Sequence, residues 1–182
     1  MPQTTRRWML RESTAVLHQA VDGAVGQFSD MAGYRRYLRA LSLFRLPLER
    51  RWAEMDWPAA LLGWRPTAVA ASIEQDLDDL SLEPVAVTAS DGLSDTADLL
   101  GMFYVVQGAT LGAQILLGRA LELGLTRDYG ARHLSVQADG LANWRSFLEV
   151  LESAPDIDMN RVVSASQSTF QRAEIAFKSS HA

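Results

Sequence analysis

An uncharged stretch of 20 residues, 99–118 (LLGMFYVVQGATLGAQILLG), constrains the fold of this chain more than any other feature. The stretch is long and apolar enough to cross a bilayer, and two of its glycines have the spacing that membrane helices use to dimerise. However, it contains the polar side chains of Gln107, Thr110 and Gln114, and the other helical segments are amphipathic. We therefore predict a buried central helix of a soluble bundle rather than a membrane span.

Helical periodicity also dominates the rest of the chain, and no stretch alternates apolar and polar residues as a half-buried strand does. Ser29 or Asp30 is expected to cap a long second helix, which Pro47 kinks or breaks. Ser94 or Asp95 is expected to cap the apolar helix, which continues to about residue 123. The other helices are predicted at residues 5–25, 58–62, 67–80, 127–134, 141–151 and 158–177, with a loop at 82–94.

These elements predict an all-α fold, a bundle of seven to nine helices in a single domain covering residues 1–182. The ends, about 1–4 and 178–182, are expected to be flexible. The first residues carry positive charge but no apolar core segment, which indicates no signal peptide and favours a cytoplasmic location.

Composition excludes several classes of function. The chain has 17 basic and 22 acidic residues, a formal net charge of −5, which argues against binding nucleic acid through its phosphates. It has no cysteine, which excludes disulfides, thiolate metal sites and iron–sulfur clusters. Of the three histidines, His181 lies next to the C-terminus and His133 has no carboxylate nearby in the sequence. We therefore predict that His133 is a surface or boundary residue.

The third histidine, His18, lies in the first predicted helix. Arg11, His18 and Asp22 are seven and four residues apart, so they lie within roughly 60° of one another on that helix. Asp22 can hold one ring nitrogen of His18 and leave the other free to bind a metal. Arg11 lies about 10 Å along the axis from His18. The plainer alternative is a polar boundary histidine paired with Asp22.

Glycines mark one side of the apolar helix. Gly101, Gly108 and Gly112 recur at intervals of seven and four residues, although each glycine in a helix costs about 1 kcal/mol relative to alanine. Something must approach this side closely: either another helix, the plainer alternative, or a flat ligand. A histidine ligand, a glycine-lined wall and a cation for an anionic edge together describe a haem pocket.

At these two helices the sequence resembles the haem (heme) oxygenases, and most closely their bacteriophytochrome-associated bacterial group. Residues 10–22 (LRESTAVLHQAVD) resemble the proximal helix of that family, and residues 104–116 (YVVQGATLGAQIL) resemble its distal helix. Weaker matches at 131–134, 140–147 and 165–170 follow in the family's order. The resemblance implies a single-domain helical bundle of the haem-oxygenase type with a kinked, glycine-containing distal helix.

The resemblance also implies roles for individual residues. His18 would be the axial ligand of the haem iron, supported by Asp22, which is shorter than the usual glutamate and would act through water. Gly108 and Gly112 would let the distal helix approach the haem, and Gln107 would help to hold distal water. The remaining cofactor-binding residues would be Arg11 and Arg145 at the propionates, and Thr14, Tyr104 and Phe170 around the ring. Ala109 and Ala113 depart from the residues of other members.

The implied activity is cleavage of haem, both cofactor and substrate, by O2 and reducing equivalents to biliverdin, CO and iron. An electron donor such as a ferredoxin and a bacteriophytochrome as biliverdin acceptor would be the partners, with no nucleic acid and no membrane. Three alternatives stay open: a haem- or tetrapyrrole-binding protein without turnover, a non-haem member of the same superfold such as a di-iron protein, and a helical interaction module.

Overall fold

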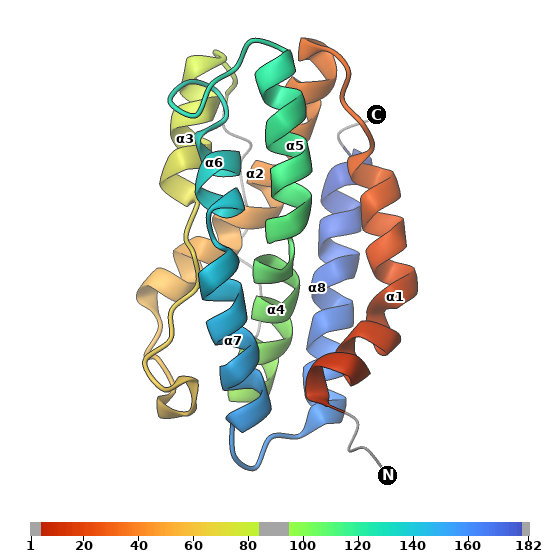
Figure 1. Ribbon diagram of the computed structural model, residues 1–182, viewed down its shortest axis with the longest axis vertical. Helices are drawn as coiled ribbons and strands as arrows, with labels where there is room; N and C mark the ends of the chain where they lie inside the picture. Colours follow the sequence, from red (N-terminus) through yellow and green to blue (C-terminus); the bar gives the residue numbers. More distant parts are fainter. Residues whose placement is uncertain (1–4, 84–94, 180–182) are drawn as a thin grey trace.

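The computed structural model describes residues 5–83 and 95–179, and within them the chain is helical apart from turns and isolated bridges at Thr126 (Figure 1). The predicted all-α fold is confirmed. The expectations for residues 1–4, 84–94 and 180–182, His181 among them, fall outside these ranges, whereas Lys178 and Ser179 belong to the last helix. The elements are α1 (Arg6–Val25), α2 (Met31–Glu54), the short 3-10 helix η1 (Ala59–Leu61), α3 (Ala70–Asp79), α4 (Thr96–Gly108), α5 (Thr110–Glu122), α6 (Arg132–Ala138), α7 (Leu141–Ser153) and α8 (Met159–Ser179).

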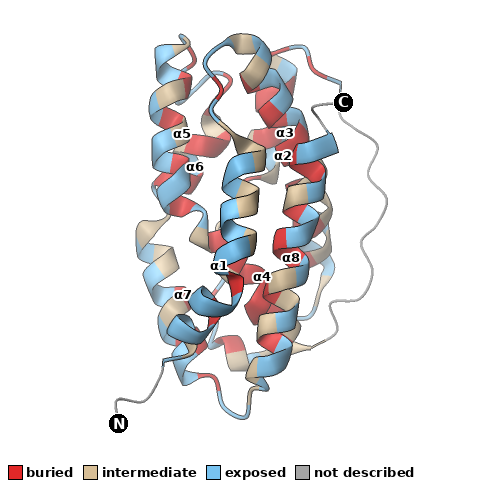
Figure 2. Cartoon of the chain, turned by 90° about the vertical axis from the view of Figure 1, so that its right-hand side faces the viewer, coloured by how far each residue is buried: buried red, intermediate tan, exposed pale blue. Residues whose placement is uncertain are grey.

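The helix α4 forms the centre of the bundle. It packs most extensively on α8, and α1 lies along the other side of α8 (Figures 1 and 2). Its buried side chains include Leu100, Met102 and Phe103. Thr96–Glu122 is long and apolar enough to cross a membrane, and 56% of its most apolar window is buried inside the protein. The first half of the apolar stretch, α4, is therefore the buried core helix that the sequence predicts. The second half, α5, is a separate helix that is only partly buried, with Leu111 58% and Ile115 61% exposed.

Side-chain caps fix where several helices begin. The carboxylate of Asp30 accepts a hydrogen bond from Gly33 N, and that of Asp95 accepts from Ala97 N and Asp98 N. Such caps satisfy amide groups that have no partner within the helix. Both are residues that the sequence offers for this role. Pro47 does not end α2, which continues to Glu54.

The predicted helix at 127–134 is wrong in its position. Thr126 and Tyr129 pair with each other through their backbones, and Gly130 has a φ of +72°, a conformation that glycine adopts readily. The chain therefore turns before α6 begins at Arg132. The hydroxyl of Tyr129 donates to Asp79 O at 2.8 Å, which holds this turn against α3.

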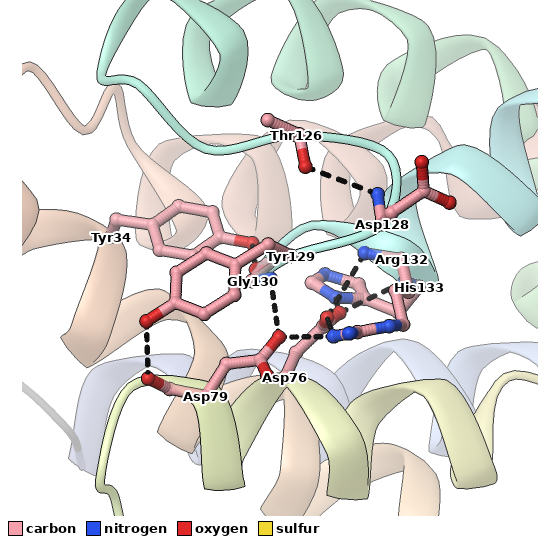
Figure 3. A network of polar contacts seen from close by, with 9 residues as sticks. All are labelled: Tyr34, Asp76, Asp79, Thr126, Asp128, Tyr129, Gly130, Arg132 and His133. Carbon is pink, nitrogen blue, oxygen red and sulfur yellow. Dashed lines mark hydrogen bonds and ion pairs between the residues drawn. The ribbon is translucent and has the colours of Figure 1, made fainter.

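His133 is not the surface or boundary residue predicted, because it is fully buried at the start of α6. Its Nδ1 lies 2.7 Å from a carboxylate oxygen of Asp76 (Figure 3). Its Nε2 lies 3.3 Å from the hydroxyl of Tyr37. Arg132 pairs with both Asp76 and Asp79. Asp76 is 57 residues from His133 in the sequence, so local spacing gives no sign of this contact.

Gly101, Gly108 and Gly112, three of the four glycines in the apolar stretch, do not share one bare side. A Cβ at Gly101 would lie 2.7 Å from Ala165 Cβ and 2.9 Å from Ser166 N, so this glycine allows close packing of α4 on α8. A Cβ at Gly108 would meet only Trp144, at 3.5 Å, and one at Gly112 would meet nothing within 4 Å. The helix-packing explanation holds for Gly101, and the other two glycines face more open surroundings.

We expect Gly101→Ala to lower the free energy of unfolding by about 1–3 kcal/mol, because α8 must move away from the added methyl group. Gly118→Ala is the matched control, since a Cβ there meets nothing within 4 Å. The control is expected to be neutral or stabilising by up to ~1 kcal/mol, from the better helix propensity of alanine. Urea unfolding of both variants measures the difference, and equal stabilities would contradict the close α4–α8 contact.

Candidate functional site

His18 lies on α1 with 58% of its side chain exposed. Its Nδ1 is 3.0 Å from a carboxylate oxygen of Asp22, one helical turn further on. The carboxylate therefore reaches the ring directly, without the bridging water that its short side chain had led us to expect. This contact keeps the Nδ1 proton in place and leaves the Nε2 lone pair available to a ligand. Among the described residues, Asp22 at Nδ1 is the polar partner of the His18 ring, and Nε2 is left without one.

An aromatic residue of α8 supports the other side of the imidazole. The ring of Phe170 is buried, and its centroid lies 5.6 Å from that of His18 with the planes tilted by 59°. Because α1 lies along α8, Phe170 limits how the imidazole can turn. The structure thus brings together His18, Asp22 and Phe170 as the sequence resemblance implies.

Tyr104 links α1 to α4. Its side chain interacts with the hydroxyl of Thr14, and its ring centroid lies 5.8 Å from that of Trp144 on α7. Thr14 is buried, and its hydroxyl donates to Leu10 O at 2.7 Å. The contact of Tyr104 with Thr14 fixes the relative height of α1 and α4.

Above this contact, α1 and the segment formed by the end of α4 and by α5 move apart. His18 is one turn after Thr14, and Gly108 is one turn after Tyr104, so His18 and Gly108 reach a similar height. The helices α1 and α4 both run upward in Figure 1. Between α1 and α5 there is no extensive backbone contact. The half-exposed imidazole therefore stands on the side of α1 that faces the α4–α5 segment, at a height where α1 and α5 are not packed together.

The wall formed by α5 is apolar although it is exposed. Leu111 is 58% exposed and Ile115 is 61% exposed, and at 100° per residue they lie on the same side of the helix as Gly108 and Gly112. Exposed apolar side chains that cluster beside bare backbone mark a binding surface for an apolar ligand. The sequence-based interpretation missed Leu111 and Ile115, although their spacing relative to the glycines is visible in the sequence.

Two cations lie at the lower edge of this region. Burial raises the pKa of the Tyr104 phenol, and the positive charges of Arg7 and Arg11, together with Thr14, oppose part of that rise. Arg7 and Arg11 therefore lie close enough to act on Tyr104, and both are exposed. Arg7 was absent from the predicted site. Arg145 is also exposed, on α7 next to Trp144.

The structure does not bring Gln107 to this region. Gln107 is buried, and its amide accepts from Thr67 N at 3.2 Å and donates to Thr67 O at 3.4 Å. Gln114 donates to Ala138 O at 3.3 Å. The buried amide of Gln107 is therefore engaged away from the glycines, whereas Gln114 is exposed and uses one N–H group in its contact with Ala138. Within residues 5–83 and 95–179, no group of three or more His, Cys, Asp or Glu side chains is placed to hold a metal ion.

Two known proteins are similar to this chain, one in sequence and one in structure. The chain is 29% identical to Heme oxygenase PigA of Pseudomonas aeruginosa over 164 residues, which cover 83% of this chain and 81% of that protein. The chain is a homologue of bacterial haem oxygenases. The fold of this haem oxygenase homologue also matches the heme oxygenase of Neisseria meningitidis, solved with bound NO and CO, with a TM-score of 0.75. That match has 21% sequence identity and covers 97% of this chain and 92% of the other. No family model matches the chain.

The residues of this haem oxygenase homologue fit a haem group. Haem needs a neutral imidazole for its iron, a flat apolar space for its ring and cations for its propionates. His18 meets the first need because its Nε2 is unused. The face shared by Gly112, Leu111 and Ile115 meets the second need, and Arg11 lies at the lower edge of the region, where a propionate can reach it.

Proposed function

We propose that this chain binds haem between α1 and the α4–α5 wall and cleaves it with O2 and electrons to biliverdin, CO and iron. The observation that carries the proposal is the His18 imidazole, half exposed at the height of Gly108 with Asp22 on Nδ1 and Nε2 unused. Its similarity to proteins named heme oxygenases from two bacteria supports the same reaction.

Each predicted site residue other than Gln107 then has a specific task. His18 Nε2 binds the haem iron, and Asp22 keeps the imidazole in the required tautomer. Gly108 and Gly112 leave room for the ring, while Tyr104, Thr14 and Phe170 line its edges. Arg11 provides positive charge for one propionate, and Arg145 provides it for the other.

Bound haem supplies the iron that activates O2 and is itself the molecule oxidised. The protein contributes an orientation and a partly dry surface. Leu111 and Ile115 exclude water from one face of the ring, and a histidine ligand promotes O–O cleavage less than a thiolate does. Because the buried amide of Gln107 is engaged elsewhere, we propose that backbone groups near Ala109 hold the water that delivers protons.

The remaining partners are proposed from the resemblance of residues 10–22 and 104–116 to the bacteriophytochrome-associated group. We propose a ferredoxin-like electron donor, a bacteriophytochrome as the acceptor of biliverdin, and a cytoplasmic location. In the apolar segment Thr96–Glu122, 56% of the most apolar window is buried, which supports a place in the bundle rather than a membrane span.

A haem titration of the purified protein tests the proposal. We expect a Soret band that saturates at one haem per chain and decays to biliverdin absorbance when ascorbate is added in air. His18→Ala should lose the band, while Gln19→Ala, an exposed neighbour on the same helix, should keep it. A stable band without decay would indicate a haem-binding protein without turnover, and a wild-type protein without any band would refute haem binding.

Arg11 is expected to orient the haem through a propionate. Arg11→Glu should weaken haem binding by about tenfold, roughly 1.4 kcal/mol, or change the ratio of biliverdin isomers, because a like charge repels the propionate. The comparison with Arg145→Glu separates the two cations. Haem titration and chromatography of the products measure both effects, and an unchanged affinity and isomer ratio in Arg11→Glu would remove this role.

A further inference from the structure

A buried ion pair on α2 lies next to residues 107–110, which we call the α4–α5 junction. Arg45 and Glu49, one turn apart on α2, are almost completely buried. The Nε of Arg45 donates to Glu49 Oε1 at 3.0 Å. The other oxygen of Glu49 accepts from Val69 N and Ala70 N, both at 2.8 Å, and thereby caps α3. Every atom of the Glu49 carboxylate therefore has a partner.

The guanidinium of Arg45 extends past Glu49 to the end of α4. Its Nη1 donates to Val106 O at 3.4 Å, and its Nη2 donates to Thr67 O at 3.4 Å. Thr67 is also bound by the side-chain amide of Gln107, and Asn143 donates to its hydroxyl at 2.9 Å. Arg45 and Gln107 thus tie the last turn of α4 to the same residue of the η1–α3 connection.

The junction itself needs such partners. At Ala109 the two helices meet, and a break in a helix leaves carbonyl groups that require other donors. Val106 O accepts from Arg45, and Gln107 O accepts from the hydroxyl of Thr110 at 2.8 Å. The side chains of Arg45 and Thr110 therefore help to determine where α4 ends and α5 begins.

We propose that Arg45 is a positioning residue for the distal wall: through Val106 and Thr67 it fixes the junction at Ala109, and so sets where Gly108 and Gly112 stand relative to His18. This inference rests on the proposed function, in which those glycines lie against haem. A buried ion pair contributes little net stability compared with apolar packing, and its best-attested use is to fix one arrangement among several.

The substitution Arg45→Lys separates positioning from folding. Lysine keeps the charge opposite Glu49, but its single ammonium group cannot reproduce the planar fork that reaches Glu49, Val106 and Thr67 at once. Arg132→Lys is the matched control, because Arg132 also pairs with buried or partly buried carboxylates, those of Asp76 and Asp79, but does not contact the junction.

Hydrogen exchange of the haem-free protein gives the first readout. We expect the amides of residues 107–112 to exchange about tenfold faster in Arg45→Lys than in wild type, from the loss of one buried hydrogen bond, and to be unchanged in Arg132→Lys. Equal protection of this segment in wild type and Arg45→Lys would overturn the proposal. So would an equal loss of protection in Arg132→Lys, since that would indicate general destabilisation.

The haem-loaded protein gives the second readout. Carbon monoxide added to the reduced complex should show one C–O stretching band in wild type and a shifted or split band in Arg45→Lys, because the wall beside it is displaced. The two proposals fail differently. A wild type that binds no haem refutes the proposed function, while the exchange experiment still decides the role of Arg45.

If Arg45→Lys does not fold, the double variant Arg45→Met with Glu49→Gln replaces it. This variant leaves no unpaired buried charge, and the amide oxygen of glutamine can still accept from Val69 N and Ala70 N. It lacks any donor to Val106 O, so faster exchange at 107–112 supports the proposal and wild-type protection overturns it.

Discussion

Gly112→Leu is expected to abolish haem binding and leave the fold intact. A Cβ at residue 112 meets nothing within 4 Å, so the haem-free protein can accept the side chain without strain. Leucine is also the better helix former, by up to ~1 kcal/mol. The same side chain would occupy the space assigned to the haem ring. We expect the affinity to fall at least about 100-fold, or about 2.8 kcal/mol at 1.4 kcal/mol per tenfold.

Gly118→Leu is the control for this prediction. Gly118 lies on the same helix, and a Cβ there also meets nothing within 4 Å. Six residues separate the two glycines, so the side chains leave the helix about 120° apart. Haem titration and thermal unfolding of both variants provide the comparison. Normal haem affinity in Gly112→Leu would show that the ligand does not lie against this face.

Asp76→Asn is expected to cause the largest loss of stability, about 3–5 kcal/mol. The carboxylate of Asp76 accepts from the backbone amides of Arg132 and His133, each at 3.0 Å, and from both of their side chains. An asparagine would place its NH2 group, a donor, against these N–H donors. Arg132 would also lose one of its two carboxylate partners and keep only Asp79. Asp139→Asn is the control, because its pair with Arg127 is exposed and should change stability by less than about 0.5 kcal/mol.

The same network makes stability depend on pH. Burial lowers the pKa of His133 below its ordinary 6.5, although Asp76 opposes the shift. Burial alone would raise the pKa of Asp76, but hydrogen bonds from His133 and Arg132 hold it below its ordinary 3.8. The unfolded chain therefore takes up protons first, and stability falls as the pH drops below about 6.5. Urea unfolding at pH 7.5 and pH 5 should show this fall, and a smaller one in His133→Gln.

Local features of the fold can be predicted from the sequence because their causes are local. The caps at Asp30 and Asp95 lie next to the helices that they begin, and the period of apolar residues marks α1, α7 and α8. The pair formed by His18 and Asp22 is equally local, since residues four apart on a helix are always neighbours.

Contacts between distant parts of the chain could not be predicted in this way. Gln107 binds Thr67, which is 40 residues away, so its amide is unavailable to water on the distal side. Gly101 and Gly112 have similar neighbours in the sequence. Their roles differ because α8 packs against Gly101 and not against Gly112. The sequence does not indicate Arg7 as a site residue, because its effect on the pKa of Tyr104 depends on how α4 lies beside α1.

The small number of buried residues in α1 has a consequence for kinetics. Only Leu10 and Thr14 of this helix are fully buried, and one face of α1 is largely exposed in Figure 2. Its first turn is held by Arg6, which donates to Leu151 O and Ala154 O, and by Glu152. Segments with few buried contacts open at a lower free-energy cost than the whole protein. The upper part of α1 should therefore detach and return many times before the bundle unfolds, which would give a rigid, flat molecule a way in and an open-chain, more flexible product a way out.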